Sequence, residues 1–469
     1  MAALADYLQA ALARAQSPIE GADGAVAPEQ LLARARAIAG ELVALKISPA
    51  EPVLATFSNH PADLAAMLGI WLAGGVVVPL HADAAARTAE GLQRAVGARL
   101  RIGRDRVEIV AATPPPAREL LRQAALILFT SGSTGSPKGV VIGHDRLAGK
   151  LEVLDRLLRL SAQDGVVVPL QLTFIFGIWV SLLTLQRGAR LVLVPKFTPE
   201  GLSRSLAGGA TVLAAVPSML RAMVGGKLEA PALGKILTGG ELFPAALGES
   251  VRAMLPRAGI YDLYGLTETG SCDFCLPPGE RGEGAGSIGR PTEGVDFRVI
   301  GEDGRLTPDG TSGELCIRTP FDMLGYLDDP ALTAASFSEG HFRTGDLARV
   351  RTDGRVEIVG RLKDIISRGG NKIAPAEIDA LLSSHPGVAA ALSAGIPDAR
   401  LGEAICAIVV PKPGAELTAD ALRRWAAERI EKFKVPDTIY FRDTLPLGPT
   451  GKVLRSGVAR VAREMAGQP

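Results

Sequence analysis

Helix-like segments alternate with short apolar runs through much of this 469-residue chain. Residues 30–46 (QLLARARAIAGELVALK) and 62–75 (ADLAAMLGIWLAGG) have the apolar spacing of helices. The apolar runs beside these and similar segments are residues 52–57, 76–80, 189–195 and 211–217. Short apolar strands joined by helices are typical of a parallel sheet covered on both faces, so the pattern predicts an α/β fold.

The pattern changes near residue 295, where strand–turn–strand signals replace the alternation. Residues 347–361 (LARVRTDGRVEIVGR) are typical of two strands joined by a turn at Asp353-Gly354. Further on we expect helices at 374–385 and 417–430 and strands at 388–396 and 403–411. We therefore predict a large domain over residues 1–362 and a small α+β domain over residues 363–469.

Composition excludes several classes of protein. The chain has 47% hydrophobic and 22% charged residues and a net charge of +1, which gives no reason to expect nucleic acid or an acidic membrane surface as a partner. No run of roughly 18 apolar residues occurs, so we expect no membrane span. The N-terminus lacks a basic segment before an apolar run, so we expect no signal peptide and a cytoplasmic location.

Four cysteines do not make a disulfide framework in a chain of this length. Cys272 and Cys275 form one C-x-x-C pair, but no second pair or histidine follows at the spacing of a zinc site. A redox pair and two small loop residues both remain open for this motif. Cys316 and Cys406 lie in apolar, strand-like runs, where we expect core positions.

The strongest local signal is LFTSGSTGSPKGVVI, residues 128–142. Glycines let a backbone approach an anion closely, and hydroxyls and amides donate hydrogen bonds to phosphate. Lys138 adds a positive charge. A Walker A loop has Ser or Thr after its lysine and opens a helix, whereas Gly139 and a strand-like run follow here. The pattern predicts a phosphate-binding loop of another kind and disfavours a P-loop phosphotransferase.

This loop resembles the signature of the ANL superfamily of adenylate-forming enzymes, which includes acyl-CoA synthetases. Five further blocks follow in the family's order: LTGGEL (237–242), YDLYGLTETG (261–270), RTGDLARV (343–350), GRLKDIISRGGNKIAPAEID (360–379) and PTGKVLR (449–455). The resemblance implies a large N-terminal domain of layered, parallel-rich sheets and helices with a distorted β-barrel part. It also implies a small, mobile α+β C-terminal domain.

The resemblance assigns a set of ATP-binding residues. These are Thr130, Ser131, Gly132, Ser133, Thr134, Gly135 and Lys138 around the β- and γ-phosphates, Gly240, Glu241, Leu242, Asp262, Leu263 and Tyr264 around adenine, and Asp346 and Arg361 at the ribose. It implies that Thr267 contacts the α-phosphate, that Glu268 holds Mg²⁺, and that Lys452 reaches the substrate carboxylate and the α-phosphate together. A non-catalytic ATP-binding relative is disfavoured because these charged residues are all present.

The implied reaction has two steps. A carboxylate attacks the α-phosphorus of ATP, and a thiol then attacks the acyl-adenylate. A carboxylate is ionised at pH 7, so the first step needs neither a nucleophilic side chain nor a general base. CoA is the expected acceptor, and the phosphopantetheine thiol of a carrier protein is the alternative. The resemblance places the hinge of the small domain at Lys363 and the thiol tunnel at Gly369, Gly370 and Lys372.

The substrate pocket departs from the family pattern. Many relatives have histidine where Phe174 stands, and amino-acid-activating relatives have an aspartate where Ile175 stands. An ammonium buried against isoleucine would lack a partner, so we expect an apolar or aryl acid without an α-amino group. The candidate pocket residues are Phe174, Ile175, Ile178, Leu182, Val216 and Phe274. Packing in a hydrophobic core explains these residues nearly as well.

Overall fold

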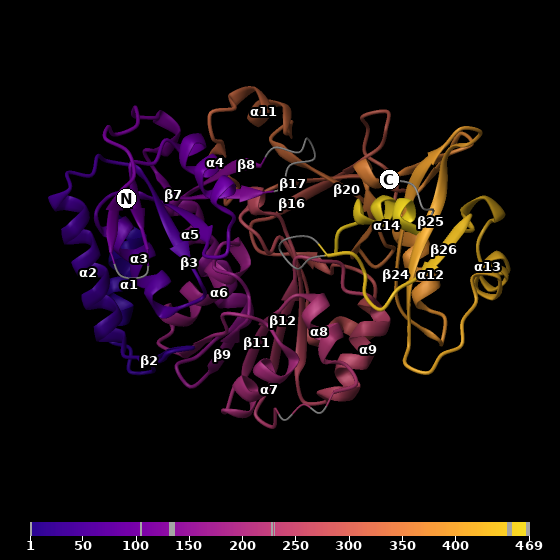
Figure 1. The fold of residues 1–469 in the computed structure, drawn as a ribbon, viewed down its shortest axis with the longest axis horizontal. Coiled ribbons are helices and arrows are strands. Elements are labelled where there is room, and N and C mark those ends of the chain that lie inside the picture. Colours follow the sequence, from indigo (N-terminus) through magenta and orange to yellow (C-terminus); the bar gives the residue numbers. More distant parts are fainter. Residues whose placement is uncertain are drawn as a thin grey trace.

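The fold has a large N-terminal part and a small C-terminal part that is orange to yellow in Figure 1. This computed structural model describes residues 2–103, 106–130, 137–226, 228, 230–447 and 453–465. Of the sequence-based expectations, a mixed α/β architecture with a small C-terminal domain is confirmed.

The largest sheet has nine strands in the order β15-β14-β13-β12-β11-β9-β10-β1-β2. Its strands are β1 (Ile19–Gly21), β2 (Gly24–Val26), β9 (Gly165–Val168), β10 (Arg190–Leu193), β11 (Val212–Ala215), β12 (Lys235–Gly239), β13 (Gly259–Tyr264), β14 (Phe274–Leu276) and β15 (Arg290–Pro291). The run from β13 to β1 is parallel, and the outer pairs are antiparallel.

A second sheet has seven strands in the order β18-β8-β7-β4-β3-β5-β6. They are β3 (Pro52–Phe57), β4 (Val76–His81), β5 (Leu100–Ile102), β6 (Val107–Ile109), β7 (Ala124–Thr130), β8 (Lys138–Gly143) and β18 (Gly325–Tyr326). The central strands β7, β4, β3 and β5 are parallel, as the helix–strand alternation predicts.

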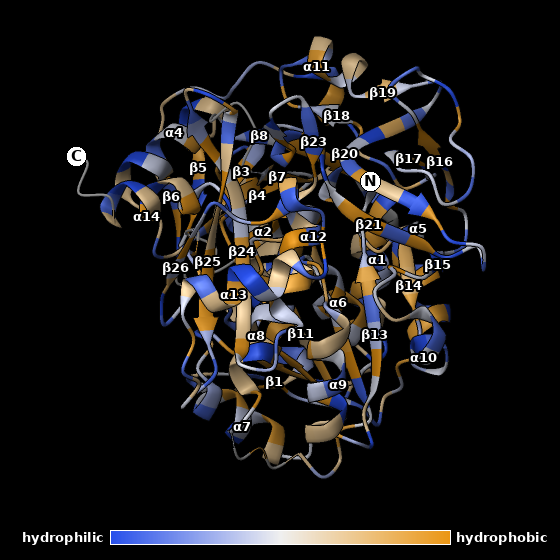
Figure 2. Ribbon diagram, turned by 90° about the vertical axis from the view of Figure 1, so that its right-hand side faces the viewer, coloured by the Kyte–Doolittle hydropathy of each residue, from blue (hydrophilic) through white to orange (hydrophobic). Residues whose placement is uncertain are grey.

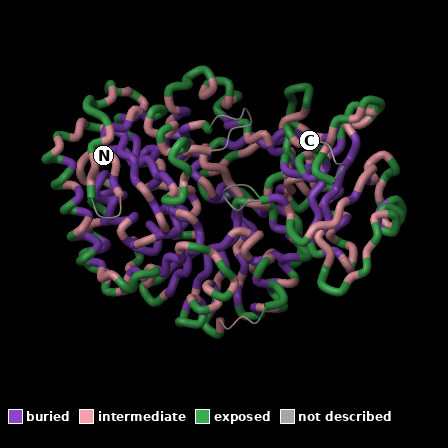
Figure 3. The backbone as a smooth tube through the Cα atoms, viewed as in Figure 1, coloured by how far each residue is buried: buried purple, intermediate pink, exposed green. Residues whose placement is uncertain are grey.

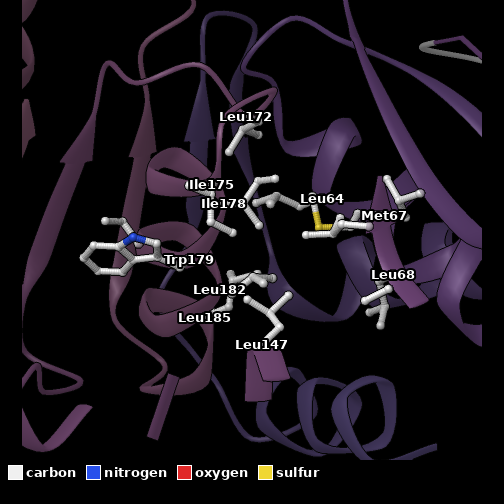
Figure 4. Close-up of a cluster of buried hydrophobic side chains, with 14 of the residues drawn as sticks. Leu64, Met67, Leu68, Leu147, Leu172, Ile175, Ile178, Trp179, Leu182 and Leu185 are labelled. Carbon is white, nitrogen blue, oxygen red and sulfur yellow. The ribbon is translucent and has the colours of Figure 1, made fainter. Parts of the chain in front are cut away.

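A layer of helices fills the space between these two sheets. It contains α1 (Ala2–Leu12), α2 (Pro28–Ala44), α3 (Pro61–Leu72), α5 (His144–Leu158) and α6 (Ile175–Gln186). The sequence of α6, IFGIWVSLLTLQ, is apolar on all sides, which suits a helix with no solvent-facing side. Figure 4 shows Ile178 and Leu182 of α6 facing Leu64 and Met67 of α3.

Both sheets are also covered on their outer faces. Val166 and Val168 of β9 pack into the layer between the sheets, whereas Val167 packs outward, because side chains alternate along a strand. The outer helices are α7 (Pro199–Ala207), α8 (Pro217–Met223) and α9 (Ala245–Met254) on the nine-stranded sheet and α4 (Ala86–Val96) on the other. Figure 3 shows the buried residues along the strands.

A third sheet is antiparallel and has five strands. They are β16 (Asp296–Ile300), β17 (Gly313–Arg318), β19 (Phe337–Ser338), β20 (His341–Val350) and β21 (Val356–Arg361), with the short helices α10 (Arg281–Gly284) and α11 (Pro330–Ala335) nearby. The predicted turn at Asp353-Gly354 joins β20 to β21, with Gly354 at φ 77°. The sheet is open, so the distorted barrel that the resemblance implied is not closed among the described residues.

The C-terminal part builds its own core around a five-stranded sheet. Its elements are β22 (Ile366–Arg368), β23 (Asn371–Ile373), β24 (Val388–Asp398), β25 (Gly402–Pro411), β26 (Thr438–Phe441), α12 (Pro375–Ser383), α13 (Ala419–Ala427) and α14 (Gly457–Met465). Ile405 and Ala407 of β25 pack under α12 and α13, and Cys406 and Ile408 pack under α14. Figure 2 shows apolar residues in orange along these strands. Among the described helices, none combines the length and apolar character needed to cross a bilayer.

Candidate active site

A cavity of about 400 Å³ lies where the two large sheets approach the antiparallel sheet. Its lining residues are Thr130, Lys138, Leu266, Glu268, Glu314, Tyr326, Ala335, Ser336, Phe342, Arg343, Thr344, Gly345, Asp346, Arg361, Leu362 and Lys363. Four of the six motif blocks therefore contribute to one cavity, although they lie far apart in the sequence.

Lys138 supplies a positive charge on the wall of the cavity. It begins β8 and pairs with Thr130, the last residue of β7. Its Nζ lies 5.3 Å from the centre of the Tyr326 ring, within the range of a cation–π contact. The predicted phosphate contacts Ser131, Gly132, Ser133, Thr134 and Gly135 lie outside the described residues.

Glu268 lies in the short 3₁₀ turn η2 (Thr267–Thr269), directly after β13. Its Oε1 accepts a hydrogen bond from the Tyr326 hydroxyl at 3.1 Å, and its carbonyl accepts one from the Met323 amide at 2.7 Å. Burial raises the pKa of the Glu268 carboxyl, while Tyr326 and Lys138 lower it. Thr267 precedes Glu268 in the turn but is not among the residues that line the cavity.

The donor set around Glu268 fits a magnesium ion that arrives with a nucleotide. Among the described residues, no group of three or more His, Cys, Asp or Glu side chains could hold a metal alone. Mg²⁺ is commonly bound through one or two carboxylates together with substrate phosphates and water. One half-buried carboxylate in the same cavity as Lys138 matches that pattern rather than an all-protein site.

Asp346 is the most buried carboxylate of the cavity wall, with 3% of its surface exposed. It lies in β20 opposite Arg361, whose Nε is 2.9 Å from one carboxylate oxygen. The Tyr264 hydroxyl donates to the other oxygen at 2.6 Å. Burial and the Asp346 carboxylate raise the pKa of Tyr264 well above its usual range, so the hydroxyl keeps its proton and remains a donor. An oriented carboxylate of this kind can accept hydrogen bonds from hydroxyl groups of a ligand.

Sequence reasoning missed several residues of this cavity, among them Glu314, Arg343 and Tyr326. Glu314 accepts hydrogen bonds from the Arg343 guanidinium at 2.6 and 2.9 Å and from the Gly345 amide at 3.2 Å. These contacts fix the backbone of β20 just before Asp346. The available signal was the lone acidic residue in the apolar strand 313–318, because a charge in such a strand is seldom buried unless it is paired.

The predicted adenine residues do not line the cavity. Glu241 accepts hydrogen bonds at 3.0 Å from the amide and the hydroxyl of Ser218, at the start of α8. Asp262 is paired with Arg281 at 3.0 Å, and burial raises its pKa to about 7 against the influence of that arginine. Gly240, Leu242 and Leu263 also lie away from the cavity, and Leu242 is half exposed. An adenine site at these residues stays a prediction.

The six candidate pocket residues pack in different surroundings. Ile175, Ile178 and Leu182 belong to the core between the sheets, where Figure 4 shows them. Phe274 is fully buried in another cluster, between the rings of Tyr264 and Phe297. Phe174 and Val216 are only partly buried. For Ile178, Leu182 and Phe274 the packing favours the alternative that the sequence left open, a core position.

Residues of the predicted hinge and tunnel follow β21. Lys363 lies in the 3₁₀ turn η4 (Leu362–Asp364) and lines the cavity. Gly369 and Gly370 form the β22–β23 turn at φ 56° and 84°, and a Cβ at Gly370 would meet no atom within 4 Å. The Lys372 ammonium donates to the Ser367 hydroxyl at 3.0 Å. Lys452, the predicted catalytic lysine, lies outside the described residues.

The cysteines Cys272 and Cys275 are both buried and free. Burial raises the pKa of the Cys272 thiol to about 12 and that of Cys275 further. A thiol reacts as its thiolate, so this setting favours two inert residues beside the active-site turn over a redox pair.

Comparison with known proteins finds similarity along most of the chain. The sequence matches the family described as AMP-binding enzyme over residues 28–120 and 104–327, and the AMP-binding enzyme C-terminal domain over residues 377–452. Feruloyl-CoA synthase of Amycolatopsis sp is 32% identical over 460 residues, which cover 92% of this chain and 93% of that protein.

Two further proteins extend the comparison. The fatty acid–[acyl-carrier-protein] ligase ScoC of Streptomyces coeruleorubidus is 33% identical over 475 residues, which cover 91% of this chain and 90% of that protein. The crystal structure of ATP-bound MatB from Rhodopseudomonas palustris has a TM-score of 0.87 and 25% identity, over 98% of this chain and 99% of that one.

Proposed function

Because the chain belongs to the AMP-binding enzyme family, we propose that it is an AMP-forming acid–thiol ligase. It activates a carboxylic acid with ATP as an acyl-adenylate, releases pyrophosphate, and transfers the acyl group to a thiol. One observation carries the proposal: Lys138, Glu268 and the Asp346–Arg361 pair line a single cavity. A cation, a carboxylate suited to Mg²⁺ and an oriented carboxylate are together what a magnesium-bound nucleotide requires.

The charges of the cavity account for the first step. The substrate carboxylate and ATP are both anions, so the site must offset their repulsion. Lys138 binds phosphate oxygens, Glu268 holds Mg²⁺, and Asp346 accepts hydrogen bonds from the ribose hydroxyls. When it is bound, Mg²⁺ would neutralise part of the charge on the phosphate oxygens. Preorganised charges of this kind stabilise the transition state without any nucleophilic side chain.

The small domain supplies the remaining groups. We assign Lys452 to the α-phosphate and the substrate carboxylate on its sequence motif. Lys363 is the hinge between residues 1–362 and 363–469, and rotation there exchanges the adenylating arrangement for the thioester-forming one. Gly369, Gly370 and Lys372 then border the path of the thiol. The open space at Gly370 supports this assignment.

The acceptor is CoA, and a carrier-protein thiol is the second candidate. The similar protein of Amycolatopsis is named a CoA synthase and that of Streptomyces coeruleorubidus an acyl-carrier-protein ligase. The acid is apolar and lacks an α-amino group, because Ile175 offers a buried hydrocarbon surface where an ammonium would need a partner. Phe174, half-buried before α6, is the candidate for contact with the acyl body.

A panel of acids tests the proposal. Purified protein is incubated with ATP, Mg²⁺ and aryl, alkyl, amino or dicarboxylic acids, and pyrophosphate is measured. We expect acid-dependent release that is strongest for apolar aryl or alkyl acids. Adding CoA or a holo-carrier protein then shows which thiol is acylated. Better activity with amino acids than with their deaminated analogues would contradict the proposed substrate class.

A further inference from the structure

The turn that carries Glu268 is followed by three left-handed residues. Gly270, Ser271 and Cys272 have φ of 80°, 69° and 52°. Glycine adopts this conformation freely, but Ser and Cys do so at a cost, and such backbone persists only where its surroundings impose it. These residues lie two to four positions beyond Glu268, the carboxylate assigned to Mg²⁺. The packing around them therefore affects the position of Glu268.

Close backbone packing encloses the segment. A Cβ added at Gly265 would collide with the Cys272 amide nitrogen, and one at Gly270 would lie 2.6 Å from the Phe321 carbonyl oxygen. The Ser271 amide donates to the Leu266 carbonyl at 2.8 Å. The chain therefore folds back on itself with no room for another side chain.

A fully buried ion pair lies at the centre of this packing. Lys150 and Asp273 both have side chains that are 0% exposed, and Lys150 Nζ lies 3.3 Å from Asp273 Oδ1. The same ammonium donates to the Cys272 carbonyl at 3.3 Å. The other Asp273 oxygen accepts from the Thr269 hydroxyl, and the Asp273 amide donates to the Tyr264 carbonyl at 2.7 Å. The pair thus contacts residues that precede the strained segment and one residue within it.

A buried ion pair is weak evidence of a gain in stability. Burying two charges costs desolvation energy that their attraction often fails to recover, and apolar replacements are frequently as stable. What the pair provides is fixed geometry. Lys150 lies on α5, which continues directly from β8, the strand that begins with Lys138. The ion pair therefore connects the strand with the phosphate-binding lysine to the turn with Glu268.

We propose that Lys150 and Asp273 are positioning residues, which hold the Thr267–Glu268 turn in the geometry that binds nucleotide-borne Mg²⁺. The proposal rests on the proposed function for the role of Glu268. Neither residue touches the nucleotide, since both are fully buried. Loss of the pair loosens the turn and weakens the contribution of Mg²⁺ to ATP binding.

Two variants test the proposal. Lys150→Met leaves Asp273 buried without a partner. The double variant Lys150→Met/Asp273→Asn leaves no uncompensated charge and keeps an acceptor for Thr269, so it serves if the single variant does not fold. Arg99→Met is the matched control, because Arg99 and Glu51 form another buried ion pair at 3.1 Å, in contact with Leu45 and Lys46 rather than with the turn.

The first readout is amide hydrogen exchange of residues 264–273 without ligand, which depends on no assumption about activity. We expect faster exchange in both Lys150 variants and no change in residues 264–273 of Arg99→Met.

The second readout is the ratio of the ATP Kd without Mg²⁺ to the ATP Kd with Mg²⁺. We expect this ratio to fall about 10–100-fold in the Lys150 variants, as for other residues that orient a metal ligand. Wild-type exchange and a wild-type ratio in the double variant would overturn the proposal. If wild-type protein binds ATP but gives no acid-dependent pyrophosphate release, the proposed function fails instead.

Discussion

Both carboxylate oxygens of Asp346 have a partner in the cavity wall, one in Arg361 and the other in Tyr264. We expect Asp346→Asn to weaken ATP binding by about 1.5–3 kcal/mol, the usual worth of a hydrogen bond to a charged group. That is about 10–150-fold in Kd. Tyr264→Phe keeps the ring against Phe274 and removes one donor, so its loss is smaller, roughly 0.5–1.5 kcal/mol. Calorimetric titration with ATP ranks the two, and a larger loss from Tyr264→Phe would argue against Asp346 as the ribose acceptor.

Lys452 is assigned from its sequence motif alone, so mutation of this residue is the direct test of the assignment. We expect Lys452→Ala to lower the rate of adenylation ~10²–10³-fold, as removal of one preorganised transition-state donor does. The control is Lys412→Ala, because Lys412 is an exposed lysine directly after β25, and this change should leave the rate unchanged. Acid-dependent pyrophosphate release measures both. A near-wild-type rate in Lys452→Ala would remove this residue from the mechanism.

Four of the charged residues named from the motifs meet in one cavity, whereas the charged adenine candidates Glu241 and Asp262 and the apolar candidates do not line it. Lys138, Glu268, Asp346 and Arg361 were named from ordered motifs, and all four line the cavity. The apolar candidate Ile178 lies instead in the core between the sheets. An isoleucine on a helix that is apolar on all sides carries no sign of whether it faces a ligand or a neighbouring helix. A buried charge, in contrast, needs a partner or a ligand, so its position is informative.

At the scale of the element, α5 begins with a histidine that is almost completely buried. Burial lowers the pKa of His144 from 6.5 to about 4, and no described residue hydrogen-bonds its Nδ1. The folded protein therefore binds fewer protons than the unfolded chain between these values. The part of the free energy of unfolding that depends on neutral His144 is fully present above pH 6.5. It is lost as the pH falls toward 4, and the loss is about 2 kcal/mol at pH 5.

We expect His144→Gln to reduce the loss of stability between pH 7 and pH 5 by about that 2 kcal/mol. Urea unfolding followed by tryptophan fluorescence at the two pH values measures the effect. His81→Gln, at a half-buried histidine that ends β4, is the control. An identical pH dependence in wild type and His144→Gln would mean that His144 is not buried as described.

The 3₁₀ turn η4 is the element where we place the hinge. Proline fixes φ, so Lys363→Pro should hinder rotation of the small domain. We expect adenylation to survive largely and thioester formation to fall much further. Because Lys363 also lines the cavity, Lys363→Ala separates the two roles: it removes the side chain but leaves the backbone free. Equal losses in both half-reactions of Lys363→Pro would contradict an alternation between two arrangements.

Most elements could be predicted from local patterns, and the exceptions have a physical reason. The helix expected at 30–46 is α2 (Pro28–Ala44), and Thr418 accepts from the Ala421 amide at the start of α13. Caps and periodicity are local, so a single sequence contains them. Closure of the antiparallel sheet depends on strand pairs distant in sequence, and there the expected barrel is an open sheet.

At the scale of the whole molecule, the central claim is that a carboxylate attacks the α-phosphorus of ATP in this cavity. Oxygen-18 in the carboxyl group of the substrate tests that claim directly, with the best acid from the panel and CoA as acceptor. Thiol attack on the acyl carbon of an acyl-adenylate leaves one carboxylate oxygen on phosphorus. Mass spectrometry should therefore find one oxygen-18 atom in AMP and none in pyrophosphate. Label in inorganic phosphate together with ADP would show attack at the γ-phosphorus and would contradict the account.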